Sequence, residues 1–412
     1  MKIIKGKYSE AVVYTDIIND TACDQIKMLC DLSFTEDCKI RIMPDAHAGA
    51  SCVIGFTADL GDKVIPNIVG VDIGCGMLTV KLGKIDIDYA RLDAVIREFV
   101  PAGQEIHESE KVAFPLMEEL HCFKWGRLKN KDLIRCSLGT LGGGNHFIEV
   151  DEDDEGEKYL VIHTGSRNLG AQVARIFQQQ AIDDLIGCNL YNAKRLEVIE
   201  DYKSRGKETQ IPQALAELAE EWEKREITIP EEYCYLTGEM RERYLHDMDI
   251  CQQFAEVNRL TIADIILQNL FGKNTDDFQW FQTIHNYVDM ETKIIRKGAV
   301  SAKKDEILLI PINMRDGSLI CIGKGNEDWN CSAPHGAGRL FSRSQAKSEL
   351  SMDNYKKSME GIYTTSVSFD TLDECPQAYK PIESILENII PTVDVLKIIR
   401  PVYNFKAGDF QK

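Results

Sequence analysis

Apolar residues recur at helical spacing over one long stretch of the chain, from Arg241 to Phe271. Steps of four and three residues bring seven side chains onto one face, namely Tyr244, Met248, Cys251, Ala255, Asn258, Ile262 and Ile265. A stripe of this period predicts a long helix with one buried face, in which Asn258 is the one strongly polar member. Similar patterns predict further helices over Leu169–Leu185, Pro212–Arg225 and Arg339–Lys347.

Short apolar runs flanked by turn residues predict strands. They cover Lys39–Met43, which is expected to end at Pro44, and then Cys52–Phe56, Met77–Leu82 and Tyr159–His163. A hairpin is predicted from Ile307–Ile312 and Ser318–Ile322, joined by the turn Arg315-Asp316-Gly317. Because strands and helices do not alternate regularly, the pattern favours an α+β fold with mixed sheets flanked by helices. No repeat or linker divides the chain, so residues 1–412 are expected to form a single large domain.

The composition is that of an ordinary globular protein, and it narrows the expected compartment. No apolar run reaches membrane-spanning length, and the segment Met1–Lys5 lacks the apolar stretch of a signal peptide. We therefore expect a cytoplasmic protein without a membrane partner. Thirteen cysteines without a repeating spacing indicate free thiols, one or two of them functional, and not a disulfide framework.

The net charge of −18 argues against a general nucleic-acid binder, because phosphate contacts need lysine and arginine. This charge is spread unevenly along the chain. The stretch Arg296–Lys347 holds nine basic and five acidic residues, which leaves room for a local basic site. Acidic residues gather at Asp151–Glu155 and over Glu217–Glu226, and these runs are interpreted as solvated loops and helix faces.

Residues 69–77, which read V-G-V-D-I-G-C-G-M, are the most informative local segment. Asp72 and Cys75 lie three residues apart among glycines, which permit positive φ and a close approach to a ligand. A carboxylate and a thiol on such a turn indicate a divalent metal ion. Cys75 as a redox or acyl-transfer nucleophile is the alternative interpretation.

Five of the eight histidines lie beside Gly, Asn, Pro or Asp in turn-like settings, namely His47, His146, His163, His285 and His335. A single histidine is usually a hydrogen-bonded or surface residue, but five in such settings indicate a site built on loops. We interpret one carboxylate, one thiol and three imidazoles as metal ligands: Asp72, Cys75, His146, His163 and His285. Five ligands exceed the need of one tetrahedral ion, so two ions sharing Cys75 are expected. Thiolate and imidazole favour zinc, and manganese and iron remain open.

The segment Gly139–Asn145 is rich in glycine but lacks the Lys-Ser/Thr that ends a P-loop. A tight turn is the simpler interpretation. The loop gains interest because His146 and Glu149 follow it directly. Glu149 is either part of a site or a surface strand residue beside the acidic run.

Residues 335–339, which read H-G-A-G-R, form a small-residue turn, with Arg343 and Lys347 at helical spacing beyond it. A neutral imidazole is a competent nucleophile toward phosphorus when cations hold the phosphate oxygens. The pattern therefore predicts a phosphoryl- or nucleotidyl-transfer site with His335 as nucleophile. The alternative is that His335 only binds a phosphate or a metal.

Several segments together resemble the RtcB family of RNA-splicing and RNA-repair ligases. They occur in the family's order between residues 43 and 381 and read M-P-D-A-H, V-G-V-D-I-G-C-G-M, G-T-L-G-G-G-N-H-F-I-E, H-T-G-S-R, H-N-Y-V, R-K-G-A-V-S-A, H-G-A-G-R-L-F-S-R and A-Y-K-P. The resemblance covers nearly the whole chain. Each motif is weak alone, but the set is highly specific.

The resemblance implies an RtcB-like fold and an RNA ligase that depends on GTP and two Mn²⁺ ions and acts in RNA repair or tRNA splicing. Such enzymes join an RNA 3′-phosphate, or a 2′,3′-cyclic phosphate after hydrolysis, to a 5′-hydroxyl through a histidine guanylate. RNA with these ends is the expected substrate, and an archease-like activator is a candidate partner.

The resemblance also implies a role for each matching residue. His335 corresponds to the guanylylated histidine, and Asp45 corresponds to the carboxylate that orients it. The metal ligands of the family correspond to Asp72, Cys75, His146, His163 and His285, with the cysteine between the two ions. Nucleotide contacts correspond to Asn145, Glu149, Asn286, Gly336, Gly338, Arg339, Tyr379 and Lys406. Arg167 corresponds to a residue that holds an RNA phosphate.

One segment departs from the family pattern. Where many members read P-G-S-M-G, this chain reads Pro311-Ile312-Asn313-Met314-Arg315, which changes residues that could line a nucleotide pocket. Two other functions remain open on the sequence: a metal-dependent RNA phosphoesterase and a catalytically inactive RNA-binding relative. A covalent guanylate on the protein would separate the ligase from both.

Overall fold

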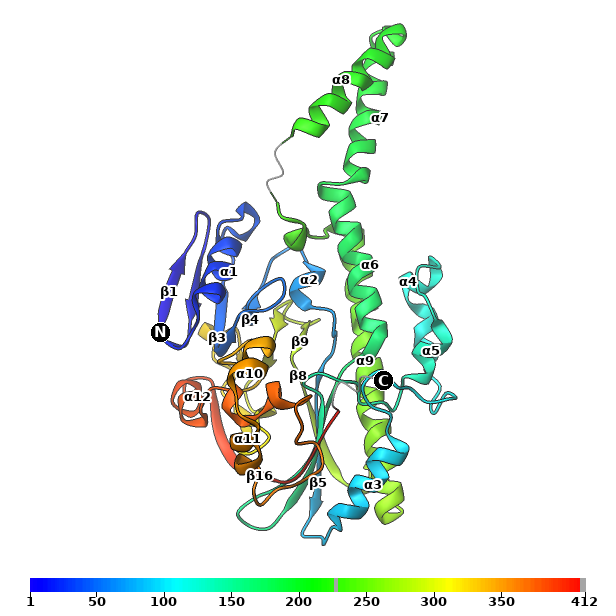
Figure 1. Cartoon of the computed structure of the whole chain (residues 1–412). Helices are drawn as coiled ribbons and strands as arrows, with labels where there is room; N and C mark the ends of the chain where they lie inside the picture. The colour runs from blue at the N-terminus through cyan, green and yellow to red at the C-terminus, as the bar shows by residue number, and fades with distance from the viewer. Residues whose placement is uncertain (226–228, 408–412) are drawn as a thin grey trace.

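Two large sheets and a set of flanking helices make up the structure (Figure 1). The computed structural model describes residues 1–225 and 229–407. The mixture of sheets and helices confirms the α+β fold expected from the irregular order of the elements. None of the described helices combines the length and the apolar character that a bilayer-spanning segment requires.

The first sheet has six strands in the order β1-β2-β3-β4-β10-β9. The strands are β1 (Lys2–Lys5), β2 (Glu10–Val13), β3 (Ile40–His47), β4 (Ile54–Ala58), β10 (Ile295–Lys297) and β9 (Asn286–Val288). Only β2 and β3 pair in parallel, across α1 (Asp20–Cys30). The prediction that a strand ends at Pro44 was wrong, because β3 continues to His47. Pro44 is tolerated there because the pairing of β3 with β4 is irregular between Ile42 and His47.

The second sheet has eight strands, with β12-β13-β16-β6-β7-β5-β8 in order and β15 beside β16. The strands are β12 (Ile307–Asn313), β13 (Gly317–Gly323), β16 (Val393–Lys406), β6 (Phe147–Glu152), β7 (Lys158–Thr164), β5 (Gly76–Gly83), β8 (Gln279–Ile284) and β15 (Tyr363–Thr364). The predicted hairpin β12–β13 and the predicted strands at β5 and β7 are confirmed. A small third sheet pairs β11 (Ala299–Ser301) with β14 (Ser332–Pro334).

The long predicted helix is α9 (Gly238–Phe271), and it packs against β5 and β7 of the second sheet beside α3 (Tyr89–Phe99) and α6 (Arg167–Leu185). Six members of its predicted seam are buried, and Ile265 is partly buried. The polar member Asn258 is fully buried because it serves the glycine loop. Its Oδ1 accepts hydrogen bonds from the backbone N–H groups of Gly139 at 2.8 Å and Thr140 at 3.1 Å. The helix therefore holds that loop in place.

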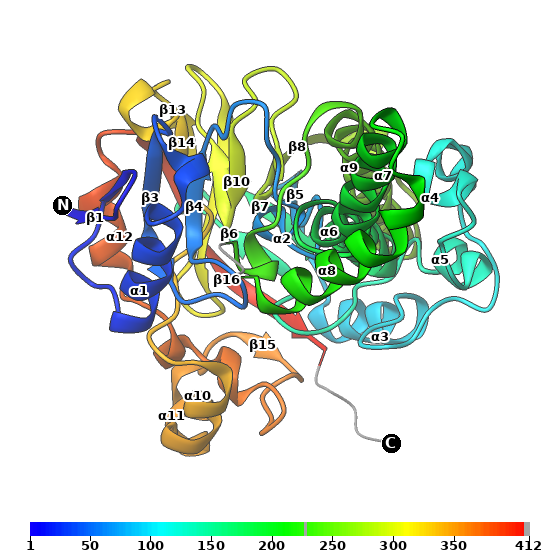
Figure 2. The same ribbon diagram turned by 90° about the horizontal axis from the view of Figure 1, so that it is seen from above.

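The other helices are short or lie at the periphery. They are α2 (Pro66–Val69), α4 (His121–Lys124), α5 (Lys131–Cys136), α7 (Cys188–Ser204), α8 (Ile211–Lys224), α10 (Arg343–Glu349), α11 (Met352–Ser358) and α12 (Ile382–Ile389). α7 and α8 form an arm that projects away from the sheets, and α10 and α11 lie together on one side of them (Figure 1, Figure 2). The predicted helix over Arg339–Lys347 starts later, at Arg343, because Ser342 caps it and accepts the N–H of Gln345.

The two acidic runs have different environments. Glu217, Glu220, Glu221 and Glu223 are exposed on α8, as expected for a solvated helix face, and Glu226 lies outside the described residues. The interpretation of Asp151–Glu155 as a solvated loop was wrong in part, because Asp151 and Asp153 are buried. Strand β6 continues through Asp151 and carries its carboxyl group into the protein.

Candidate active site

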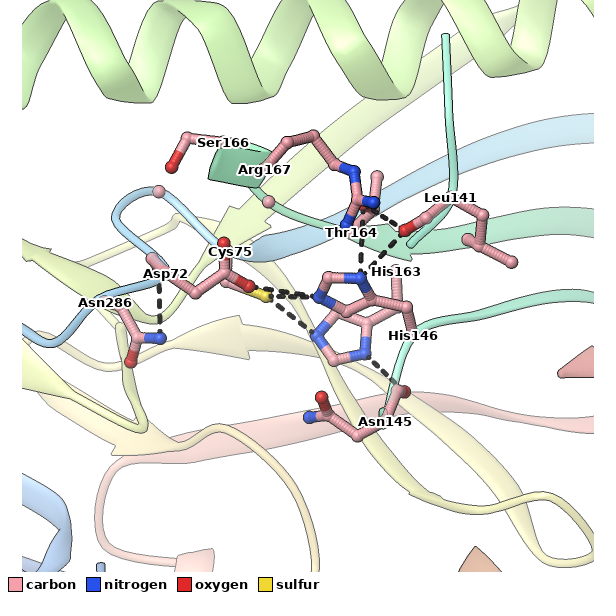
Figure 3. Close-up of polar contacts among 12 residues, drawn as sticks. Asp72, Cys75, Leu141, Asn145, His146, His163, Thr164, Ser166, Arg167 and Asn286 are labelled. Carbon is pink, nitrogen blue, oxygen red and sulfur yellow. Dashed lines mark hydrogen bonds and ion pairs between the residues drawn. The ribbon is translucent and has the colours of Figure 1, made fainter. Parts of the chain in front are cut away.

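The glycine turn before β5 places Asp72 and Cys75 on one side of a cavity (Figure 3). Gly74 has a φ of 71°, and a Cβ at this position would lie 2.8 Å from the Cα of Gln252 on α9. Only glycine fits both the backbone conformation and this close approach. The turn is therefore packed tightly between α9 and the sheet, which fixes where the carboxylate and the thiol point.

Three histidines converge on this turn from separate elements. His146 precedes β6, His163 lies on β7, and His285 lies between β8 and β9. The Cys75 Sγ lies 3.5 Å from Nε2 of His146 and 3.3 Å from Nε2 of His163. Nε2 of His146 lies 3.1 Å from the Asp72 Oδ2, and Nε2 of His163 lies 3.4 Å from Nε2 of His285. These five residues form two candidate metal-ligand groups that share Cys75: Asp72 with Cys75 and His146, and Cys75 with His163 and His285.

Backbone carbonyls orient two of these imidazoles. Nδ1 of His146 donates to the carbonyl oxygen of Leu141 at 2.8 Å, and Nδ1 of His163 donates to that of Asn145 at 3.1 Å. Each ring then presents the lone pair of Nε2 to the Cys75 thiol, and His146 presents it also to the Asp72 carboxylate, as metal-binding histidines do. Burial lowers the pKa of His163 and of His285 well below the ordinary value, so both rings are neutral. Burial also raises the pKa of the Cys75 thiol, which a bound cation would reverse.

His335 lies opposite this group and is held by a buried carboxylate. Its Nδ1 lies 2.6 Å from the Oδ2 of Asp45, which is fully buried. The same oxygen accepts the backbone N–H groups of His335 and Gly336 at 3.1 and 3.2 Å. A Cβ at Gly338 would collide with the backbone oxygen of Asp45, so the small-residue turn is needed for this approach. Nδ1 is thereby occupied, and Nε2 is the nitrogen left for chemistry.

A cavity of about 610 Å³ joins the ligand group to His335. Thirteen of the sixteen predicted site residues line it: Asp72, Cys75, Asn145, Glu149, His163, His285, Asn286, His335, Gly336, Gly338, Arg339, Tyr379 and Lys406. Asp45 and His146 lie behind this surface, in contact with His335 and with Asp72. The predicted residues are thus gathered in one place, although they come from segments spread between residues 45 and 406.

Arg167 differs from the other predicted residues. It does not line the cavity, and its guanidinium donates to Thr140 Oγ1 and to the backbone oxygen of Gly103, both at 3.2 Å. It lies over the glycine loop, on the side of His146 that faces Thr164 (Figure 3). Gly142 must be glycine because a Cβ there would collide with this guanidinium. The guanidinium lies next to the ligand group, where its positive charge would attract an approaching anion.

The wall farthest from the metal ligands is built around Glu374, and we call Glu374, Arg339, Arg343, Tyr379 and Lys406 the Glu374 network. The carboxylate accepts Lys406 Nζ at 2.6 Å, one nitrogen each of Arg339 and Arg343 at 2.9 Å, and the Tyr379 hydroxyl. Burial alone would raise the pKa of Glu374, but Lys406, Arg343 and Arg339 lower it to about 2. The network therefore pairs one ionised carboxylate with three cations, and Arg343 also pairs with Asp373 at 2.8 Å.

Glu149 is buried in the cavity wall between these two regions. On β6 it is paired with Asn404 of β16, whose Nδ2 donates to Oε1 of Glu149 at 2.5 Å. Burial raises the pKa of Glu149 to about 7. The interpretation as a surface strand residue is therefore wrong, because the side chain is 3% exposed.

Three residues of the site were missed as functional residues. His47 was noted but given no role, yet it lines the cavity, and burial lowers its pKa to about 4. The motif M-P-D-A-H that contains Asp45 was the available signal. Glu374 and Asn404 have no local motif, because their partners are 32 and 255 residues away in sequence.

The basic stretch does not form an open basic surface. Arg315 pairs with Asp316, Lys324 with Asp394, and Lys303 with Asp289 and Glu291. Arg339, Arg343 and Lys347 pair with Asp373 or Glu374. The local excess of basic residues in the sequence is therefore largely offset by acidic residues from other segments.

Comparison with known proteins assigns the whole arrangement to one family. Residues 25–123 and 123–407 match the sequence profile described as "tRNA-splicing ligase RtcB". The chain belongs to the RtcB family. It is 28% identical to the RNA-splicing ligase RtcB of Escherichia coli strain K12, over 89% of this chain and 90% of that protein. It is 27% identical to the tRNA-splicing ligase RtcB of Nanoarchaeum equitans and 25% identical to that of Archaeoglobus fulgidus, over 89% and 87% of this chain.

The segment 311–315, which departs from the family pattern, lies largely in the cavity wall. Pro311, Ile312, Asn313 and Met314 all line the cavity. Asn313 closes the β12–β13 turn, since its Oδ1 accepts the N–H groups of Arg315 and Asp316 at 3.0 and 2.9 Å. The β12–β13 hairpin of this chain thus contributes Ile312, Asn313 and Met314 to the cavity wall.

Proposed function

We propose that the chain is a GTP- and Mn²⁺-dependent RNA ligase that joins an RNA 3′-phosphate, or a 2′,3′-cyclic phosphate after hydrolysis, to a 5′-hydroxyl. The observation that carries this proposal is His335 on the buried Asp45 carboxylate, facing two candidate metal-ligand groups across one cavity. The names of the RtcB relatives support RNA as substrate and RNA repair or tRNA splicing as the setting.

His335 is the nucleophile in this proposal. Nε2 attacks the α-phosphorus of GTP, the bond to the bridging oxygen of the β-phosphate breaks, and pyrophosphate leaves. The proton on Nδ1 stays between the ring and Asp45, whose charge stabilises the cationic imidazole that forms. The GMP group is then passed to the RNA 3′-phosphate. The 5′-hydroxyl attacks this activated phosphate, GMP departs, and a phosphodiester bond results.

The ligand set fits two divalent ions. Neutral imidazole nitrogens and a carboxylate are available, and a central thiol can bridge two ions as thiolate. Bound ions would neutralise charge on the phosphate oxygens during both transfers. A thiolate among imidazoles also suits zinc, so metal analysis of the purified protein is part of the test. Family resemblance favours manganese.

The remaining residues are assigned to substrates. Asn145 and Asn286 contact the nucleotide phosphates beside the metal ligands. Glu149 accepts hydrogen bonds from the N1–H and N2–H₂ groups of guanine, which adenine cannot donate. Arg339, Tyr379 and Lys406 surround the guanine and ribose after the Glu374 network opens, and Gly336 and Gly338 leave room for the backbone to approach the nucleotide. Arg167 holds an RNA phosphate.

Two wider expectations accompany the proposal. An archease-like activator is a candidate partner, since the nucleotide side of the cavity is closed by ion pairs. All thirteen cysteines are free, which supports the expected cytoplasmic location.

The decisive experiment is incubation with GTP labelled at the α-phosphorus and Mn²⁺, followed by denaturing gel electrophoresis. A labelled protein band, lost in His335→Ala and discharged by RNA with a 3′-phosphate, supports the ligase. RNA 3′-phosphate hydrolysis without protein labelling would instead identify a phosphoesterase. Neither labelling nor turnover would identify an inactive relative.

A further inference from the structure

A third group of metal-capable side chains lies outside the cavity, where α4 meets the first third of α9 (Figure 1, Figure 2). It consists of His121, the first residue of α4, and of His246 and Asp247 on α9. Nδ1 of His121 lies 2.9 Å from Oδ1 of Asp247, and Nδ1 of His246 lies 3.2 Å from the same oxygen. None of the three residues lines the 610 Å³ cavity.

The Asp247 carboxylate is fully buried and already carries several hydrogen bonds. Oδ1 accepts the backbone N–H of His121 at 2.8 Å, and Oδ2 accepts that of Cys122 at 2.9 Å. Within residues 1–225 and 229–407, its only ion-pair partners are the two imidazoles. No lysine or arginine in these ranges pairs with this buried carboxylate. A divalent cation between the three side chains would compensate its charge.

The spacing of the three ligand atoms allows one metal ion to bind all of them. The two distances of 2.9 and 3.2 Å are close to those between ligand atoms in the family's metal site, which run from 3.1 to 3.5 Å. Ligands about 2.1 Å from a common zinc ion are separated by roughly 3.3 Å when the geometry is tetrahedral. All three ligand atoms also lie within 4.8 Å of one another.

The chemistry of this group differs from that of the cavity. The Cys122 thiol is fully buried and is not among the three grouped ligand atoms. Two imidazoles and one carboxylate are a typical ligand set for Zn²⁺. The side chains of His121 and His246 are 29% and 43% exposed, so solvent can reach a fourth coordination position.

We propose that His121, His246 and Asp247 form a separate zinc site that fastens α4 to α9. α4 has only four residues and is flanked by η2 (Pro115–Glu119) and the loop before α5, so it has little secondary structure to hold it. One metal bond to His121 and two metal bonds to His246 and Asp247 of α9 would hold α4 in place. None of the three residues lines the 610 Å³ cavity, so the proposed role of the site is structural.

The test uses the full chain carrying Cys75→Ala, so that the metal centre in the cavity is disabled. After removal of metals with a chelator, Zn²⁺ titration should show one site per chain with submicromolar affinity. Adding His246→Gln, or His121→Gln in a second variant, should weaken this affinity at least 100-fold. Adding His107→Gln, which removes an imidazole outside all three groups, should leave it unchanged.

Cobalt substitution separates this site from the cavity. Co²⁺ in the cavity of the parent chain contacts Cys75 and should give a sulfur-to-cobalt charge-transfer band, whereas Co²⁺ in the proposed site should give ligand-field bands alone. The proposal is overturned if the Cys75→Ala chain binds no Zn²⁺ at micromolar concentration, or if its Zn²⁺ affinity is the same with and without His246→Gln. His246 is a partly exposed helix residue, so circular dichroism should confirm that this variant folds.

Discussion

The two walls of the cavity pair their buried polar groups in different ways. On the metal-ligand wall, backbone carbonyls orient two imidazoles, and three imidazole nitrogens converge with one carboxylate and the Cys75 thiol. On the opposite wall, the Glu374 network pairs one carboxylate with three cations and a tyrosine hydroxyl. The acceptor atoms of the first wall need a cation to bind, whereas the carboxylate of the second wall is already paired with cations of the chain itself.

This difference indicates that the metal-ligand wall is preorganised and that the Glu374 network must open before a nucleotide binds. A metal ion entering the first wall displaces little, because the ligand atoms already lie 3.1 to 3.5 Å apart. A nucleotide entering the second wall must break charge-assisted hydrogen bonds to Glu374 before Lys406 or Arg339 can contact it. Metal binding is therefore expected to be tight and fast, and nucleotide binding is expected to need rearrangement.

The largest effect is expected from removal of the nucleophile between the walls. His335→Ala should abolish protein labelling by GTP and lower RNA ligation by roughly three orders of magnitude or more, because the covalent route is lost. Two-metal binding should be unchanged, since His335 is not one of the metal ligands. Persistent labelling of the variant would show that another residue carries the guanylate.

A change on the metal-ligand wall should be nearly as severe. Cys75→Ala removes the ligand shared by both groups, so metal affinity should fall on the order of 100-fold or more and ligation should become undetectable. Equilibrium dialysis with metal analysis measures this directly. Cys75→Ser offers a matched control that keeps a weaker ligand and is expected to retain partial occupancy. Full activity in either variant would remove Cys75 from the site.

Asp45→Asn tests the support of His335 without removing the nucleophile. The amide cannot stabilise a cationic imidazole and can hold the wrong tautomer, so the rate of guanylylation should fall on the order of 10³-fold. Metal content should remain at the parent level. A variant that loses metal together with activity would mean that Asp45 supports the fold of both walls and not His335 alone.

Glu149→Ala tests the role of the residue that lies between the two walls. Loss of a buried acceptor costs about 1–3 kcal/mol, so GTP use should weaken roughly tenfold or more, and the preference over ATP should narrow. Competition between GTP and ATP in the labelling reaction gives the measurement. Unchanged rejection of ATP would move guanine recognition to Lys406 and Tyr379.

The smallest expected effect is a pH dependence of GTP binding. Burial raises the pKa of Glu149 to about 7, and only the ionised form accepts both guanine hydrogen bonds. KM for GTP in the labelling reaction should therefore fall severalfold as the pH rises through 7, while Glu149→Gln should flatten this dependence. The same shift has the opposite sign for stability: the folded state binds the extra proton between the ordinary pKa and 7, so Glu149 stabilises the fold less as pH rises across that window.

The sequence predicted the metal-ligand wall far better than the Glu374 network. Asp72 and Cys75 lie on one turn in which Gly74 is required by the close packing of α9, and such turns leave a local trace in the sequence. Asn404 gains its role only when β16 pairs with β6, and Glu374 gains its role only when cations from other segments gather around it. No local pattern encodes either arrangement. The same reason explains why Asp151 was wrongly predicted to lie in a solvated loop. Its acidic neighbours obscured the pattern of strand β6, which buries it.

Secondary structure shows a similar division. The end of α9 was predicted correctly and its start three residues late, because one seam repeats over about six turns. Asn258 within this seam marked a real polar contact. The end of β3 and the start of α10 were misplaced, because an irregular pairing and a serine cap decided them. Local rules therefore identify long periodic elements, while their ends depend on tertiary contacts.

The projecting α7–α8 arm has a consequence for the measured size of the molecule in solution. α7 has no buried side chain, and the arm extends well beyond the rounded body formed by the sheets (Figure 1). A rod attached to a compact body raises the frictional ratio above that of a sphere of equal mass. A single chain of 46.6 kDa should therefore elute early from a size-exclusion column, at the volume of a heavier globular protein, without any self-association. Light scattering or sedimentation, which report mass independently of shape, are the methods to use when counting its subunits.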